Sequence, residues 1–177
     1  PGSVQRCPAR SSRATSAGFS AYNNNPSSNY QTPEKIEGSL NTPMVAGQKY
    51  YVRFYISLAD YSEYAVENIG IHFHRAYHPT TYNYPFSELG LYNGQLLQII
   101  SNGQPVGAIV NPQVINTNGA ITDTQNWVEI RGEYIAVGNE DRFVITSFGE
   151  YNSSNTVYLG SNLCAYYHTA YYYVDDI

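Results

Sequence analysis

The sequence predicts an all-β fold, a two-sheet β-sandwich of the jelly-roll type. Three observations predict it: apolar and polar residues alternate in several short segments, Gly, Pro, Asn and Asp separate these segments, and no stretch of useful length shows the helical period. The composition agrees, because 19 tyrosines accompany only 9 lysines and arginines, and tyrosine is enriched in strands. Many short strands with regular turns are typical of sandwiches and jelly rolls.

Two segments show the clearest strand pattern. In residues 49–58 and 69–74, every second residue is a large apolar one. A period of two is the mark of a strand with one buried face, so we expect the alternate residues to face away from the core. These outward residues are Tyr51, Arg53, Tyr55, His72 and His74.

Further strands are expected along the rest of the chain. The segments are 18–22, 34–40, 96–100, 108–115, 127–136, 142–148 and 171–177. A tight turn at 138–141 is expected to join 127–136 and 142–148 into a hairpin. We expect residues 1–177 to form one domain, with an irregular segment at 1–30 and a long loop at 75–94.

Charge and motifs argue against several classes of function. The net charge of −5 is not that of a nucleic-acid binder, and no apolar run reaches the roughly 20 residues of a membrane-spanning helix. No nucleophile, zinc-protease or phosphate-loop motif is present. Glu129 and Glu133 share a strand face, but about 13 Å separates them, which exceeds glycosidase spacings. We therefore expect that the protein is not an enzyme. Trp127 begins an expected strand in a segment that otherwise has the pattern of core residues, so we expect it to pack in the core.

Two cysteines, Cys7 and Cys164, lie near the two ends of the chain. They form a disulfide in an oxidising compartment or remain two unpaired thiols, and the sequence leaves both alternatives open. No signal peptide is visible at the start. The chain stops inside an expected strand, which favours an excerpt from a longer protein.

The outward residues of the two clearest strands predict a binding surface if both strands lie in one sheet. Tyrosine rings pack against the apolar faces of sugars, while charged groups bind the hydroxyls. Four tyrosines of the long loop are expected to wall this site: Tyr77, Tyr82, Tyr84 and Tyr92. The alternative is that the outward tyrosines only cover a loop or a second layer. His72 and His74 are either a transition-metal pair awaiting a third ligand or a solvent-facing pair.

Several segments together resemble a module of Bacteroidota surface proteins that precedes peptidoglycan-binding OmpA-type domains. Residues 43–52 read PMVAGQKYYV and 54–60 read FYISLAD. The similarity continues at 64–70 (YAVENIG), 121–123 (ITD), 127, 132–136 (GEYIA) and 171–177 (YYYVDDI). It covers about residues 34–74 and 113–177. The wider relatives are galactose-binding-like jelly rolls, including carbohydrate-binding modules.

This resemblance implies non-catalytic glycan binding or adhesion and a structural calcium. It favours Asp175 as a calcium ligand, with Asp176 beside it on the opposite strand face. Both residues are otherwise ordinary polar groups at a strand end. An Asn-rich segment ending in Phe-Glu, which supplies part of the calcium site in such modules, is missing here.

The expected function is therefore a secreted or cell-surface module that binds a polysaccharide or glycoconjugate. A second hypothesis is self-assembly into a surface layer or filament, because tyrosine is enriched in protein interfaces. A hydrolase-associated domain is a third.

Overall fold

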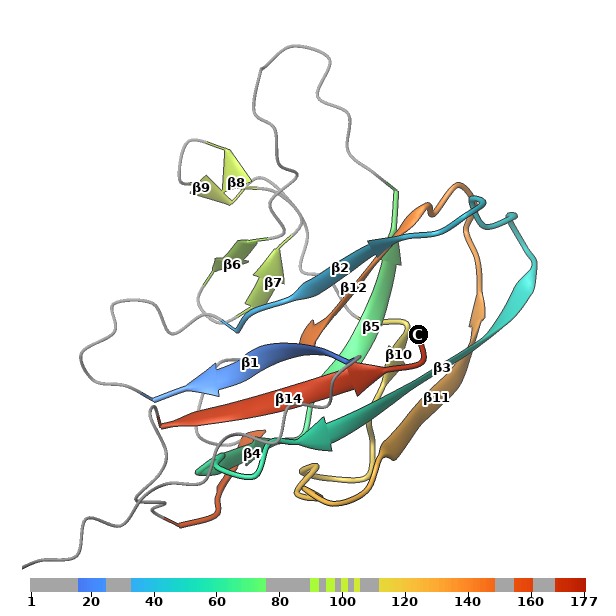
Figure 1. Cartoon of the computed structure of the whole chain (residues 1–177). Coiled ribbons are helices and arrows are strands. Elements are labelled where there is room, and N and C mark those ends of the chain that lie inside the picture. The colour runs from blue at the N-terminus through green and yellow to red at the C-terminus, as the bar shows by residue number, and fades with distance from the viewer. Residues whose placement is uncertain are drawn as a thin grey trace, which may run out of the picture.

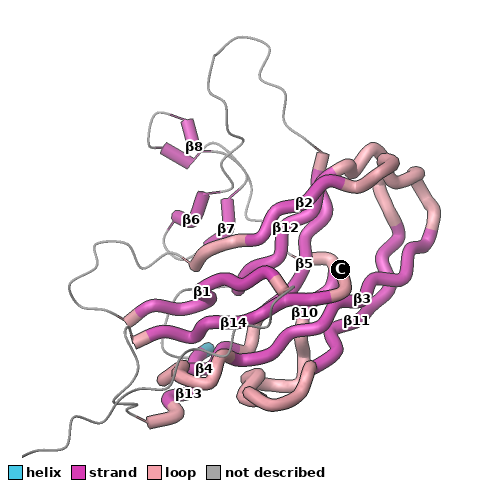
Figure 2. Tube along the Cα trace, in the orientation of Figure 1, coloured by secondary structure: helices cyan, strands magenta, loops and turns pink. Residues whose placement is uncertain are grey.

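The structure is a computed structural model, and it describes residues 16–24, 33–75, 112–148, 155–160 and 168–177, together with the backbone of four short strands between residues 90 and 105 (Figures 1 and 2). Throughout these parts of the chain the regular elements are strands in antiparallel ladders, and there is no α-helix. The predicted all-β class is therefore confirmed. Among the described residues, no helix has the length and apolar character needed to cross a membrane.

The first four-stranded sheet, called sheet A, has the order β1-β14-β3-β11 (Figure 1). Its longest strand is β3 (Lys49–Leu58), which lies between β14 (Thr169–Asp175) and β11 (Val128–Ile135). The edge beyond β14 is β1 (Ala17–Asn23). All three pairings are antiparallel.

The second four-stranded sheet, called sheet B, has the order β10-β5-β12-β2. Its central strands are β5 (Ile69–His74) and β12 (Arg142–Ser147), which pair antiparallel over six residues. The edges are β10 (Val114–Ile115) and β2 (Ile36–Ser39). The side chain of Gln113 extends the β10 edge, because its amide both accepts from the N–H of Phe73 and donates to the carbonyl of Phe73.

Shorter ladders lie outside the two main sheets. β4 (Tyr64–Val66) pairs with β13 (Thr156–Tyr158). The remaining strands form two small pairs, β6 (Gly90–Tyr92) with β7 (Gln95–Leu97) and β8 (Ile100–Ser101) with β9 (Gln104–Pro105).

The two main sheets contribute apolar side chains to one buried cluster. Phe54, Ile56 and Leu58 come from β3, and Ile69 and Ile71 come from β5; all are at most 1% exposed. The predicted inward orientation of the apolar residues in these two strands is therefore confirmed. Burial of such side chains stabilises the fold by roughly 1.5–3 kcal/mol each.

A buried tyrosine adds a polar connection inside this core. Tyr172 is fully buried, and its hydroxyl donates to the carbonyl of Ile121 while it accepts from the N–H of Val66, both at 2.9 Å. Burial raises the pKa of this phenol well above its ordinary value. One side chain of β14 thus provides hydrogen-bond partners for backbone groups of two other segments.

The expected hairpin of residues 127–136 with 142–148 is wrong. β11 pairs with β3, whereas β12 pairs with β5 and β2 in the other sheet. The connection takes positive φ at Gly138 and Asn139, and the buried carboxylate of Glu140 accepts hydrogen bonds from the N–H groups of Val137 and Gly138 and from the Tyr134 hydroxyl. These contacts turn the chain away from β11, so it crosses to sheet B instead of folding back.

Four other expected strands match observed ones with small shifts at their ends. The segments 18–22 and 171–177 overlap β1 and β14, and the segments 34–40 and 142–148 contain β2 and β12. The segment 96–100 overlaps the separate strands β7 and β8, and the described part of 108–115 contains β10. β4 was not expected, because three residues are too short to show a period of two.

Candidate functional site

The three outward residues of β3 lie as the alternation predicts. The side chain of Tyr51 is 79% exposed, Arg53 is exposed and Tyr55 is half-buried. The guanidinium of Arg53 lies over the ring of Tyr55, with 5.5 Å from its carbon to the ring centroid. This contact holds the charge above an aromatic surface.

β11 adds a charged residue beside each of these three. Its register places Glu133 opposite Tyr51, Arg131 opposite Arg53, and Glu129 opposite Tyr55. Arg131 and Glu129 approach to 3.4 Å, and the hydroxyl of Tyr55 donates to Glu129 at 3.4 Å. Each row across the two strands therefore exposes polar hydrogen-bonding groups.

β14 adds two more tyrosines on the same side. Ala170, Tyr172 and Val174 point into the core, so the alternate residues Tyr171 and Tyr173 point outward. Their rings lie edge to face with centroids 5.7 Å apart. The absence of a side chain at Gly18 on β1 makes this possible, because a Cβ there would lie 2.6 Å from the Tyr171 hydroxyl.

We call these outward side chains of β3, β11 and β14 the sheet A face: Tyr51, Arg53, Tyr55, Glu129, Arg131, Glu133, Tyr171, Tyr173 and Asp175. Tyr171 and Tyr173 were not among the expected site residues. Three consecutive tyrosines give no alternation of polarity, so their orientation could not be assigned. The apolar Ala170 and Val174 on either side are the signal that was available.

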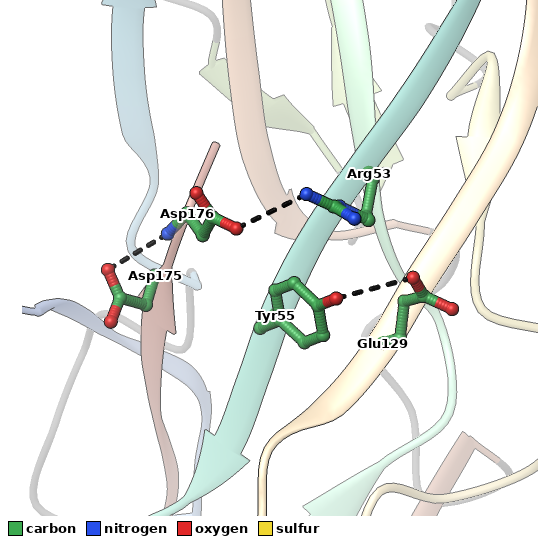
Figure 3. Close-up of polar contacts among 5 residues, drawn as sticks. All are labelled: Arg53, Tyr55, Glu129, Asp175 and Asp176. Carbon is green, nitrogen blue, oxygen red and sulfur yellow. Dashed lines mark hydrogen bonds and ion pairs between the residues drawn. The ribbon is translucent and has the colours of Figure 1, made fainter.

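Asp175 and Asp176 lie at the end of β14, close to β3 (Figure 3). Asp176 takes a left-handed conformation with φ of 53°, its N–H donates to the Asp175 carboxylate at 2.9 Å, and its own carboxylate lies 3.5 Å from Arg53. Calcium takes about 6–8 oxygen ligands. Asp176 faces a cation already, and the described residues contain no group of three or more His, Cys, Asp or Glu that could hold a metal.

The histidines do not join this surface. His72 and His74 lie on β5 in sheet B, whereas the tyrosines lie in sheet A, so the expected plate of Tyr, Arg and His does not form. His74 is also buried, at 7% exposed, which corrects its expected exposure to solvent. The two imidazole rings are stacked with centroids 6.0 Å apart. His74 Nδ1 is 3.2 Å from the carbonyl oxygen of Arg75, and its Nε2 is 3.9 Å from Glu37.

Other expected site residues cannot be placed. Cys7, Cys164, Tyr77, Tyr82 and Tyr84 lie outside the described residues, and only the backbone of Tyr92 is described, as the end of β6. Trp127, expected in the core, is half-buried and directly precedes β11.

The ion pair between Glu63 and His168 lies apart from the sheet A face. The carboxylate of Glu63 is buried, and one of its oxygens lies 2.5 Å from Nδ1 of His168, whose side chain is 58% exposed. The Glu63 carboxylate orients the histidine, and among the described residues no third His, Cys, Asp or Glu joins the pair into a group that could hold a metal.

Comparison with protein-family models, with curated proteins and with solved structures found no match for this chain. Its function must therefore be argued from the site itself.

Proposed function

We propose that this protein is a non-catalytic glycan-binding or adhesive module, and that a polysaccharide or glycoconjugate binds to the sheet A face. The observation that carries the proposal is the mixture of exposed or half-buried tyrosines, arginines and carboxylates in register on one regular sheet. Tyrosine rings pack on the apolar faces of sugars, and the charged groups between them bind hydroxyls. The strands hold these groups in fixed positions, so little ordering is needed on binding.

The strand order supports a jelly roll as the architecture of this module. When the eight strands of the two main sheets are counted along the chain, the first pairs with the last, the second with the seventh, the third with the sixth, and the fourth with the fifth. Successive pairs alternate between sheets A and B. This order of pairs is the one expected if a single long antiparallel ribbon wraps into a double-sheet jelly roll.

We further propose that the chain forms a single domain of an exported protein at the cell surface. Calcium binding by Asp175 is a separate part of the proposal, and no step of glycan binding depends on it. Titration with calcium tests it directly. A rise in melting temperature that an Asp175→Asn variant loses supports the site, and an unchanged melting temperature of the wild type rejects it.

Glycan binding is tested by measuring the purified protein against plant, host and bacterial polysaccharides. The informative variant is Tyr51→Ala, because this side chain is largely exposed and its removal leaves the core intact. We expect at least about a tenfold loss of affinity, or 1.4 kcal/mol. The control is Tyr158→Ala, since Tyr158 is also exposed but lies on β13, outside sheet A. Absence of binding to every polysaccharide rejects the proposal, as does wild-type affinity in the Tyr51 variant.

One observation favours self-assembly as the alternative function. Val45, Ile135 and Val137 are 58%, 61% and 81% exposed. They belong to neighbouring segments, because the N–H of Gly47 donates to the carbonyl of Ala136. Exposed apolar groups of this kind favour association. Light scattering at rising concentration tests it: a Val137→Ser variant should lower the observed mass, and a strict monomer at all concentrations excludes assembly.

A further inference from the structure

Two arginines lie directly opposite each other at the centre of the sheet A face. Arg53 of β3 pairs in register with Arg131 of β11, and their side chains are 56% and 77% exposed. Side chains at facing positions have Cβ atoms about 4.5–5.5 Å apart, and like charges placed there destabilise the sheet. The pair thus places like charges opposite each other across two strands. Other polar residues would fit at these exposed positions without this repulsion.

The neighbouring carboxylates compensate this repulsion only in part. Arg53 reaches Asp176 at 3.5 Å, and Arg131 reaches Glu129 at 3.4 Å. Both contacts are longer than the 2.7 Å ion pair between Lys49 and Glu133 on the same two strands. Exposed pairs of this kind contribute little to stability. Each guanidinium also carries several N–H donors in a planar fork, so donors remain for a ligand.

A local conflict without full compensation is expected at functional sites. An anion bound between the two guanidiniums relieves their repulsion, whereas a neutral sugar does not. The guanidinium fork matches a carboxylate through two parallel hydrogen bonds. Tyr51 and Tyr55 lie two residues before and after Arg53, so aromatic and cationic groups alternate along β3 about every 6.6 Å. A chain of sugar rings carrying carboxylates fits this alternation.

We propose that the Arg53–Arg131 pair makes the sheet A face selective for acidic polysaccharides, in which uronic acids are interspersed with neutral sugars. This inference rests on the proposed glycan-binding function. Interspersed charge is required because Glu129 and Glu133 flank Arg131 on β11 and repel a ligand that is charged at every unit. The same two carboxylates, together with the net charge of −5, disfavour a nucleic acid on this face.

The test compares each acidic polysaccharide with its own carboxyl-reduced form. Glucuronoxylan, gum arabic and xanthan serve as probes, and dextran sulfate and single-stranded RNA report on other anions. We expect at least about tenfold tighter binding to the acidic forms, and an affinity for them that falls as salt is added. The double variant R53Q/R131Q should lose this preference and bind both forms alike. The control R75Q removes an exposed arginine at the end of β5, in the other sheet, and should keep it.

The outcomes separate the inference from the function on which it rests. Equal binding of acidic and reduced forms by the wild type overturns the selectivity but leaves glycan binding intact. No binding to either form overturns both. If the double variant still prefers the acidic forms, the selectivity does not come from the Arg53–Arg131 pair. If the wild type binds dextran sulfate or RNA more tightly than the uronic acid probes, the proposed preference for uronic acids is wrong. The melting temperature of the double variant controls for folding and should not fall, because the substitutions remove a repulsion.

Discussion

The outer faces of the two main sheets show opposite relations to solvent. On sheet A, the residues of β3 that alternate with the core are exposed or half-buried at Tyr51, Arg53 and Tyr55, and the series ends in Ser57, which is buried. On sheet B, the equivalent residues include His74, Val144 and Thr146, which are 7%, 0% and 1% exposed. Val144 does not belong to the shared core cluster, although it is completely buried. The outer face of sheet A is therefore mostly open to solvent, whereas that of sheet B is buried at His74 and along the middle of β12.

This difference shows what alternation can and cannot predict. A period of two assigns residues to the two faces of a strand, and it did so correctly for β3 and β5. It does not say whether the outer face meets solvent, because this depends on what else packs there. The same reasoning therefore predicted exposure correctly for Tyr51 and wrongly for His74.

The largest effect should come from a charge placed on the outer face of sheet B. We expect Val144→Asp to lower the free energy of unfolding by about 3–5 kcal/mol, because it buries a carboxylate without a partner. The matched substitution on sheet A, Tyr51→Asp, should lower it by less than about 1 kcal/mol, because the new carboxylate is exposed and only meets the repulsion of Glu133 opposite it. Urea denaturation measures both. Similar small effects at the two positions would show that the outer face of sheet B is open to water.

The second largest loss of stability should come from a substitution in the core that both sheets share. Tyr172→Phe removes the hydroxyl that satisfies Val66 N–H and the Ile121 carbonyl. We expect a loss of about 3 kcal/mol, since each orphaned buried group costs on the order of 1–3 kcal/mol. Tyr171→Phe, one residue earlier on the outward side, is the control for thermal or urea unfolding. Equal stability of the two variants would contradict the proposed role of the buried hydroxyl.

Glu140, in the connection between β11 and β12, should make the stability of the fold depend on pH. Burial alone raises the pKa of Glu140, but hydrogen bonds from Tyr134, Val137 and Gly138 outweigh it, so the pKa is lowered from 4.5. The ionised carboxylate of Glu140 therefore stabilises the fold fully above pH 4.5. This stabilisation is lost as the pH falls through the pKa of Glu140 in the folded protein, which is lower than 4.5.

Unfolding as a function of pH tests this in the wild type and in Glu140→Gln. The variant should be less stable at neutral pH and should lose less stability on acidification. Glu133→Gln is the control, because the side chain of Glu133 is half exposed. If the variant and the wild type respond equally to acid, Glu140 does not contribute.

The smallest effect is expected at His74, whose buried Nε2 has no hydrogen-bond partner within the described structure. His74→Phe keeps a ring of similar shape and removes this unsatisfied atom, so stability should change by less than about 1 kcal/mol or increase. Thermal unfolding measures the change. A loss of several kcal/mol would mean that the imidazole makes an essential polar contact.

Much of the fold was predictable because it depends on local patterns. The strands β3, β5 and β11 were recognised from alternation, and the positive φ at Gly138 and Asn139 fits a turn-forming segment. The candidate site was predictable from alternation only in its β3 part, and Asp175 was expected there only as a calcium ligand implied by the resemblance. Glu129, Arg131 and Tyr171 join it through strand register, and register between distant segments leaves no trace in a single sequence.

The sequence by itself determined that strands form and which of their side chains turn toward the core, because that choice follows from hydrophobicity repeating every second residue. Only the tertiary structure decided which strands became neighbours. It separated the histidines of β5 from the tyrosines of β3 and placed Arg131 opposite Arg53. Strand pairing is set by the packing of a whole core and by long connections, and these are properties of the complete fold.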